Sequence, residues 1–82
     1  MDYLLGQLLL LPYSNDWAPQ GTFKCEGQLL QIADYAALFS LLSTKFGGDG
    51  ISNFALPDLR EQAPEGTYYC IVIDGIYPSR PY

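Results

Sequence analysis

The side chains that most often carry enzyme chemistry are sparse in this sequence. Histidine is absent, so the commonest general base, triad partner and zinc ligand near neutral pH is missing. A serine nucleophile would need Lys24 or Lys45 buried beside it. Nine acidic residues could supply a paired-carboxylate site, but nothing in the sequence brings two of them to a defined separation. We therefore expect no enzyme activity and no cofactor or metal site.

A glycine cluster with one acid invites comparison with calcium-binding and phosphate-binding loops; it comprises Gly47, Gly48, Asp49 and Gly50. Calcium-binding glycine–aspartate repeats need several stacked copies, and one carboxylate supplies too few oxygens for that ion. A phosphate loop would need a Lys-Ser/Thr pair and a following helix, which the cluster lacks. We expect glycines at backbone positions with positive φ and an Asp49 carboxylate that accepts hydrogen bonds from neighbouring amides.

Pro57, Asp58 and Arg60 form a second loop motif. It has two interpretations, a docking motif for a partner and a turn that orders the loop. The turn is favoured, because an aspartate after proline can accept backbone amides and the planar fork of Arg60 can bind a carboxylate or carbonyls.

Cys25 and Cys70 permit an intrachain bridge, two free thiols or links between chains, and their spacing does not choose among them. An intrachain bridge would close a loop of about 46 residues and contribute roughly 4 kcal/mol. Buried, apolar thiols are the favoured alternative.

Four aromatic residues could together form a patch that stacks on sugars: Tyr13, Trp17, Phe23 and Phe46. Hydrophobic packing beneath a long loop is the favoured interpretation of the same residues.

The composition indicates one small domain with more apolar surface than it can bury. Of 82 residues, 49% are hydrophobic, 15% aromatic and 16% charged. A domain of this size buries only about 60 to 65% of the surface of its unfolded chain. We expect part of the apolar surface to meet another subunit.

The charge and the apolar runs exclude several partners. A formal net charge of −5 repels phosphate backbones and anionic lipid headgroups, so nucleic acid is not an expected partner. The aliphatic run from Leu8 to Leu11 is too short to span a membrane, and we expect no membrane insertion. Residues 1–5 lack the basic start of a secretory signal.

The first half of the chain predicts three strands and a helix. Residues 4–11 read as a strand, and residues 22–26 and 29–32 as a hairpin that turns at Gly27 and Gln28. Residues 35–45 predict a helix, with Asp34 as its cap and Gly47 as its left-handed end. Its apolar face has the spacing i, i+3, i+4, i+7 and consists of Tyr35, Leu38, Phe39 and Leu42.

The second half predicts an ordered Gly/Pro-rich loop over residues 47–66, with a short extended piece at 53–56. Residues 67–74 form a strand with two apolar faces, and residues 76–82 form an extended tail marked by prolines. The expected fold is α+β, with a small mixed sheet and one packed helix. Residues 1–66 make up its domain, and residues 67–82 a strand and tail that pack on it or on a neighbouring subunit.

Three stretches resemble one family: residues 18–30, Ala-Pro-Gln-Gly-Thr-Phe-Lys-Cys-Glu-Gly-Gln-Leu-Leu; residues 37–42, Ala-Leu-Phe-Ser-Leu-Leu; and above all residues 46–60, which end Phe-Ala-Leu-Pro-Asp-Leu-Arg. Together they resemble the phage tail collar domain, found in tail fibres and in bacterial proteins called microcystin-dependent proteins. The family normally continues Arg-Gly-Arg and a middle segment, whereas this chain has Arg60-Glu61-Gln62 and soon reaches an ending similar to that of microcystin-dependent proteins. The receptor-binding part of a fibre would lie in the shortened middle, so the resemblance implies a structural subunit.

The sequence therefore predicts a non-enzymatic structural subunit that binds copies of itself in a fibre, filament or tail-type assembly, with other tail or fibre proteins as further partners. The alternative is a tail-tip or fibre adhesin that binds a cell-surface glycan through Trp17 and its aromatic neighbours. We expect an extracellular filament or a virion-like or tail-like particle, as a ring, trimer or open filament. The predicted assembly surface is Leu8, Leu10, Tyr69, Ile71, Ile73, Ile76, Tyr77 and Tyr82.

Overall fold

The computed structural model describes residues 3–12 and 18–78, so the predictions for Tyr13, Trp17 and Tyr82 lie outside the described residues. The chain is a small α+β domain with one helix in this described part. Its elements are β1 (Leu8–Pro12), β2 (Thr22–Lys24), β3 (Leu29–Gln31), α1 (Ala36–Leu42), β4 (Asn53–Ala55) and β5 (Thr67–Val72).

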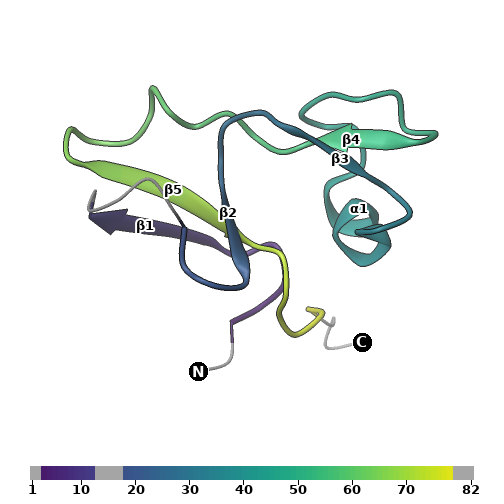
Figure 1. The fold of residues 1–82 in the computed structure, drawn as a ribbon, viewed down its shortest axis with the longest axis horizontal. Coiled ribbons are helices and arrows are strands. Elements are labelled where there is room, and N and C mark those ends of the chain that lie inside the picture. The colour runs from purple at the N-terminus through teal and green to yellow at the C-terminus, as the bar shows by residue number, and fades with distance from the viewer. Residues whose placement is uncertain (1–2, 13–17, 79–82) are drawn as a thin grey trace.

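The strands form two antiparallel sheets rather than the single mixed sheet that the sequence predicts. One has the order β1-β5-β2, and the other pairs β3 with β4 beside the helix (Figure 1). The predicted hairpin of β2 with β3 is wrong. After β2 the chain leaves β5, because Glu26 forms a bridge with Asp58, and β3 then pairs with β4 in the other sheet.

The strand predicted from residue 4 begins only at Leu8, because the chain bulges at Gly6. The Gly6 N–H donates to the Val72 carbonyl at 2.9 Å, and the Val72 N–H donates to the Gln7 carbonyl at 3.0 Å, so two residues oppose one. Gly6 has φ +83, a conformation that side chains other than glycine rarely adopt. The bulge ends the regular pairing of β1 with β5.

The helix presents the predicted face but ends differently. Leu38 is buried, and Tyr35, Phe39 and Leu42 pack partly buried against the core. The predicted cap at Asp34 is wrong, since Tyr35 occupies the N-cap position and makes no side-chain cap bond. Ser43, with φ +52, follows Leu42 and ends the helix before Lys45 and Gly47.

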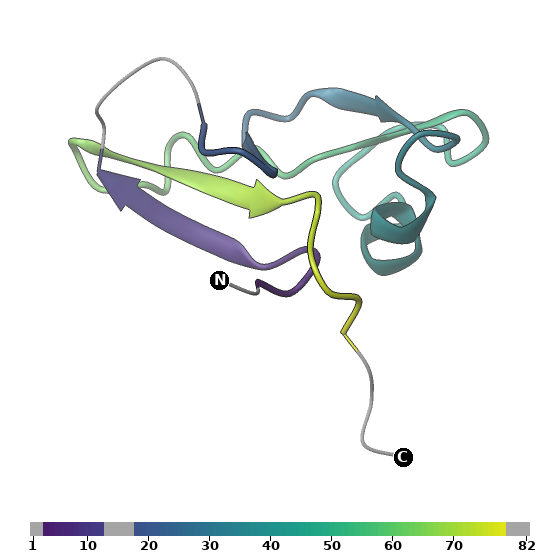
Figure 2. The same cartoon turned by 60° about the horizontal axis from the view of Figure 1, so that its bottom comes forward.

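The core lies where the two sheets and the helix meet, as two views of the fold show (Figures 1 and 2). Phe54 and Leu56 are 0% exposed, and Ile71 brings the central strand β5 into the same cluster. Phe39 packs on Phe54 with ring centroids 5.4 Å apart. Residues from every region of the sequence thus contribute to one core.

Candidate assembly surface

The core-facing side of the three-stranded sheet continues past the part that the rest of the chain covers. Leu8 pairs with Ile71, and Leu10 with Tyr69, so these side chains share one face of the sheet. Ile71 is 1% exposed, whereas Leu8 and Leu10 are each 46% exposed. The apolar face is therefore covered at β5 and uncovered at β1.

Strand order explains this difference. β5 is central, with β1 on one side and β2 on the other, whereas β1 is the outer strand of its sheet among the described residues. Ile71 is buried inside the chain and does not reach the surface predicted for it, while Tyr69 and Ile73 are half-buried.

The two ends of the described chain lie together. Leu4 and Ile76 form a parallel bridge, in which the Leu5 N–H donates to the Ile76 carbonyl at 2.7 Å. The Tyr77 hydroxyl lies 2.8 Å from the Ser40 hydroxyl on α1. Ile76 and Tyr77 remain 53% and 50% exposed, so the start of the tail is anchored on its own chain but not covered by it.

Asp49 organises the glycine loop as its residue type predicts. Its Oδ1 accepts hydrogen bonds from the backbone amides of Ile51, Ser52 and Asn53 at 2.8, 2.9 and 3.1 Å. These amide bonds lower the pKa of the Asp49 carboxyl to about 2. Gly47, Gly48 and Gly50 all have positive φ. The carboxylate therefore stabilises the turn by accepting hydrogen bonds from its backbone amides.

Arg60 binds the Asp58 carboxylate through two nitrogens of its guanidinium. Nε donates to Oδ1 at 3.0 Å and Nη2 to Oδ2 at 2.8 Å, and this contact lowers the pKa of the Asp58 carboxyl. Both side chains are exposed, so solvent screens the attraction between them. Pro57 is buried before them, and its carbonyl accepts from the Gly27 N–H at 3.3 Å.

The two cysteines are free and buried. Lys24 pairs with Cys70, so Cys70 lies on the face of Lys24 and the next residue, Cys25, turns to the opposite face and the core. Burial raises the pKa of Cys25 to about 11, with a smaller contribution from Cys70, and burial also raises the pKa of Cys70. Burial thus disfavours the thiolate form of both cysteines, which is the reactive one.

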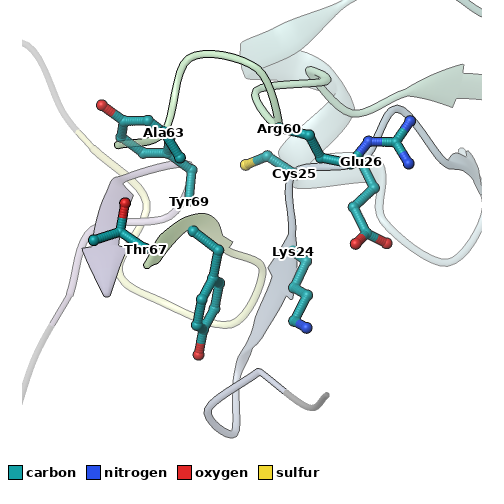
Figure 3. Close-up of a pocket in the computed structure, with 8 residues that line it drawn as sticks. Lys24, Cys25, Glu26, Arg60, Ala63, Thr67 and Tyr69 are labelled. Atoms are coloured by element: carbon teal, nitrogen blue, oxygen red, sulfur yellow. The ribbon is translucent and has the colours of Figure 1, made fainter. Parts of the chain in front are cut away.

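A cavity of about 200 Å³ opens where β2 leaves β5. Figure 3 shows Tyr69 and Thr67 from the start of β5 on one side and Cys25, Glu26 and Arg60 on the other, with the sulfur of Cys25 toward the space between them. Sequence reasoning missed this site, because the predicted hairpin kept residues 25 and 26 within a strand. No local pattern encodes the departure of the chain at Cys25.

The aromatic residues proposed for sugar stacking do not gather in the described part of the chain. Phe23 packs edge-to-face on Tyr35, with centroids 5.8 Å apart, at the border of the core. Phe46 is 45% exposed. Trp17 and Tyr13 lie outside the described residues.

No three metal-ligating side chains gather among residues 3–12 and 18–78, and no helix within those ranges is long and apolar enough to cross a membrane. No curated protein matches the chain. The family model for the phage tail collar domain matches residues 10–64, which is more than half of the sequence and contains β2, β3, α1 and β4. The chain therefore belongs to the phage tail collar domain family, whose role is that of a structural component of phage tails.

Proposed function

We propose that this chain is a non-catalytic structural subunit that self-associates, and that it works in a fibre, filament or tail-type assembly outside the cell or on a virion. Its family is that of a tail component, and its surface keeps an uncovered apolar strand. The observation that carries the proposal is the pair Leu8 and Leu10, half-exposed on the outer strand β1.

An outer strand of this kind favours association for two reasons. Its outward backbone groups can pair with a strand of another chain, and its exposed apolar side chains gain free energy when they are covered. Covering the exposed half of a leucine contributes about 1 kcal/mol. A second copy that pairs along β1 would cover Leu8 and Leu10 on both chains. Two-fold pairing closes a dimer, which further contacts would extend.

The test replaces Leu8 and Leu10 together by threonine, which keeps strand propensity and removes the apolar surface. The matched control is Leu29→Thr, because Leu29 is also an exposed leucine, 60% exposed on β3. Light scattering after size exclusion, over a range of concentrations, and electron microscopy report assembly. We expect the double variant to lose association and the control to keep it. A wild-type chain that stays monomeric at high concentration would refute the proposal.

The glycan-binding alternative depends chiefly on Trp17. A glycan array with the full chain tests it, with Trp17→Ala as the variant. Phe46→Ala is a second check, because Phe46 is one of the four aromatics proposed for sugar stacking and is 45% exposed. Sugar binding that is lost in Trp17→Ala while assembly persists would favour the adhesin. Absence of any sugar binding would leave the structural subunit as the function.

A further inference from the structure

The pairing of β5 shows which backbone groups of β1 face outward. Val72 exchanges backbone hydrogen bonds at 2.9 and 3.0 Å with the bulge that precedes β1, so it faces β1. Backbone groups of a strand point alternately to its two sides, so Cys70, two residues earlier, also faces β1, where it pairs with Leu9. Leu9 therefore bonds to β5, whereas Leu8 and Leu10 point their N–H and C=O groups toward the free edge.

Backbone features limit this free edge at both ends. Pro12 is the next residue of β1 that faces outward, and proline has no N–H. At the other end, the bulge turns the Gly6 N–H inward to the Val72 carbonyl, where an unbulged strand would point it outward. The outward donors of the edge are therefore the N–H groups of Leu8 and Leu10. Within residues 3–12 and 18–78, no backbone group bonds to them.

We propose that this edge pairs with β1 of a second copy in one antiparallel register, with Leu8 of each copy opposite Leu10 of the other and Leu9 on the two-fold axis. The inference rests on the self-association proposed above and adds the register of the contact. In this register every outward N–H of the two leucines meets a carbonyl of the other copy. β1 carries no charged residue, so no like charges oppose each other across the new ladder.

The two neighbouring registers pair the same edge less well. One puts Leu10 on the axis and Leu8 of each copy opposite Pro12 of the other, so the Leu8 carbonyl meets a ring without an N–H. The other puts Leu8 on the axis and Leu10 opposite Gly6, whose N–H is already given to β5. Burial of a carbonyl without a donor is unfavourable. The proline and the bulge thus select the register centred on Leu9.

The side chains fit the same register. Leu8 and Leu10 share one face of β1 and are each 46% exposed, so pairing puts leucine beside leucine in both halves of the contact. A two-fold axis normal to the sheet keeps this face on the same side in both copies, so the four leucines form one apolar cluster. The joined sheet has the order β2-β5-β1-β1-β5-β2, in which β1 is no longer an outer strand (Figure 2).

The test is a cysteine scan along β1 in the full-length chain, with oxidised glutathione and detection of covalent dimer. Leu9→Cys places two thiols at a non-hydrogen-bonded pair, where the Cα atoms are about 4.5 Å apart and a disulfide can form. We expect at least tenfold slower cross-linking for Leu8→Cys and Leu10→Cys, whose Cα atoms would lie about 8 Å from their copies. The wild-type chain controls for Cys25 and Cys70, which are buried.

Hydrogen exchange of the wild-type chain is a second measurement, and it needs no substitution. The amides of Leu8 and Leu10 face the free edge, so their exchange should slow at least tenfold as the chain concentration rises. The amides of Leu9 and Leu11 face β5 and should already be protected in the dilute monomer. This measurement decides alone if Leu9→Cys does not fold.

The outcomes separate the register from self-association. A chain that associates but cross-links fastest through Leu8→Cys or Leu10→Cys overturns the register and leaves the proposed function standing. An associating chain whose Leu8 and Leu10 amides exchange at the same rate at every concentration does the same. A chain that stays monomeric overturns both proposals. Rapid cross-linking through Leu9→Cys, together with protection of the Leu8 and Leu10 amides on association, supports the register.

Discussion

β1 and β4 are both outer strands, but only β4 has its free edge covered by another segment of the described chain. β4 has the glycine loop folded along its free side, where the Ala55 N–H donates to the Gly47 carbonyl at 3.1 Å and the Gly50 N–H to the Asn53 carbonyl at 3.0 Å. β1 has no such cover in the described part of the chain, and its leucines stay half-exposed. The domain thus closes one edge with its own loop and keeps the other open.

This contrast assigns different roles to the two apolar regions. Around β4, the loop and helix bury Phe54 completely, so a substitution there should act on the stability of a single chain. Along β1, a substitution should act on the contact between chains. Measurements of unfolding and of association can test this separation.

The largest effect is expected for Gly48→Ala. A Cβ at this position would collide with the Cα of Phe54, so the loop could not lie against β4. We expect the free energy of unfolding to fall by roughly 3 to 5 kcal/mol, measured by urea denaturation at low protein concentration.

Gly66→Ala is the matched control. Gly66 also has positive φ, at +84, but an added Cβ would have nothing within 4 Å. Backbone strain alone should cost about 1 to 2 kcal/mol there. Equal losses in the two variants would show that the loop does not pack tightly on β4.

The next effect compares the same side chain in the two regions. Leu38 is 1% exposed in the core, and Leu10 is 46% exposed on β1. Leu38→Ala should lower the free energy of unfolding by about 3 kcal/mol, whereas Leu10→Ala should lower it by less than about 1 kcal/mol. Denaturation of dilute monomer measures both.

The order of the two effects should reverse when association is measured instead of unfolding. At concentrations where Leu38→Ala is still folded, it should associate as the wild type does, while Leu10→Ala should associate more weakly. If Leu10→Ala destabilised the monomer as strongly as Leu38→Ala, the open edge of β1 would be part of the core of a single chain.

The local features of the fold follow from the sequence better than the pairing does. The apolar spacing around Leu38 predicts the helix, and the residue types of the glycine loop predict the amide bonds of Asp49. Strand partners depend on contacts between distant residues. Glu26 meets Asp58 across the fold, and no pattern near Gly27 distinguishes that crossing from a hairpin.

For the candidate surfaces, too, the sequence indicates the local features, and the strand pairing decides the rest. Alternation within residues 8–12 indicates which leucines share a face, but only the order β1-β5-β2 shows that Leu8 and Leu10 are uncovered while Ile71 is buried. The cavity was beyond sequence reasoning for the same reason, since it exists only because β2 is shorter than β5.

The smallest effect concerns the loop that covers β4 and its dependence on pH. The pKa of Asp49 is about 2 in the folded chain, below the value near 4 of an unfolded aspartate. The carboxylate form is therefore favoured by folding. Its contribution is fully present above about pH 4 and is lost as the pH falls from there through about 2.

We expect the amide resonances of Ile51, Ser52 and Asn53 to move together with a midpoint near pH 2, because all three donate to the same carboxylate oxygen. In Asp49→Asn the side chain keeps an acceptor oxygen but loses its charge, so this titration should vanish while the fold persists. Amides of β1 should show no midpoint near pH 2 in either chain, because no group with a lowered pKa lies on that strand. A midpoint near pH 4 at Ile51 would mean that the carboxylate is not held by the turn. The closed edge would then depend on the glycines alone.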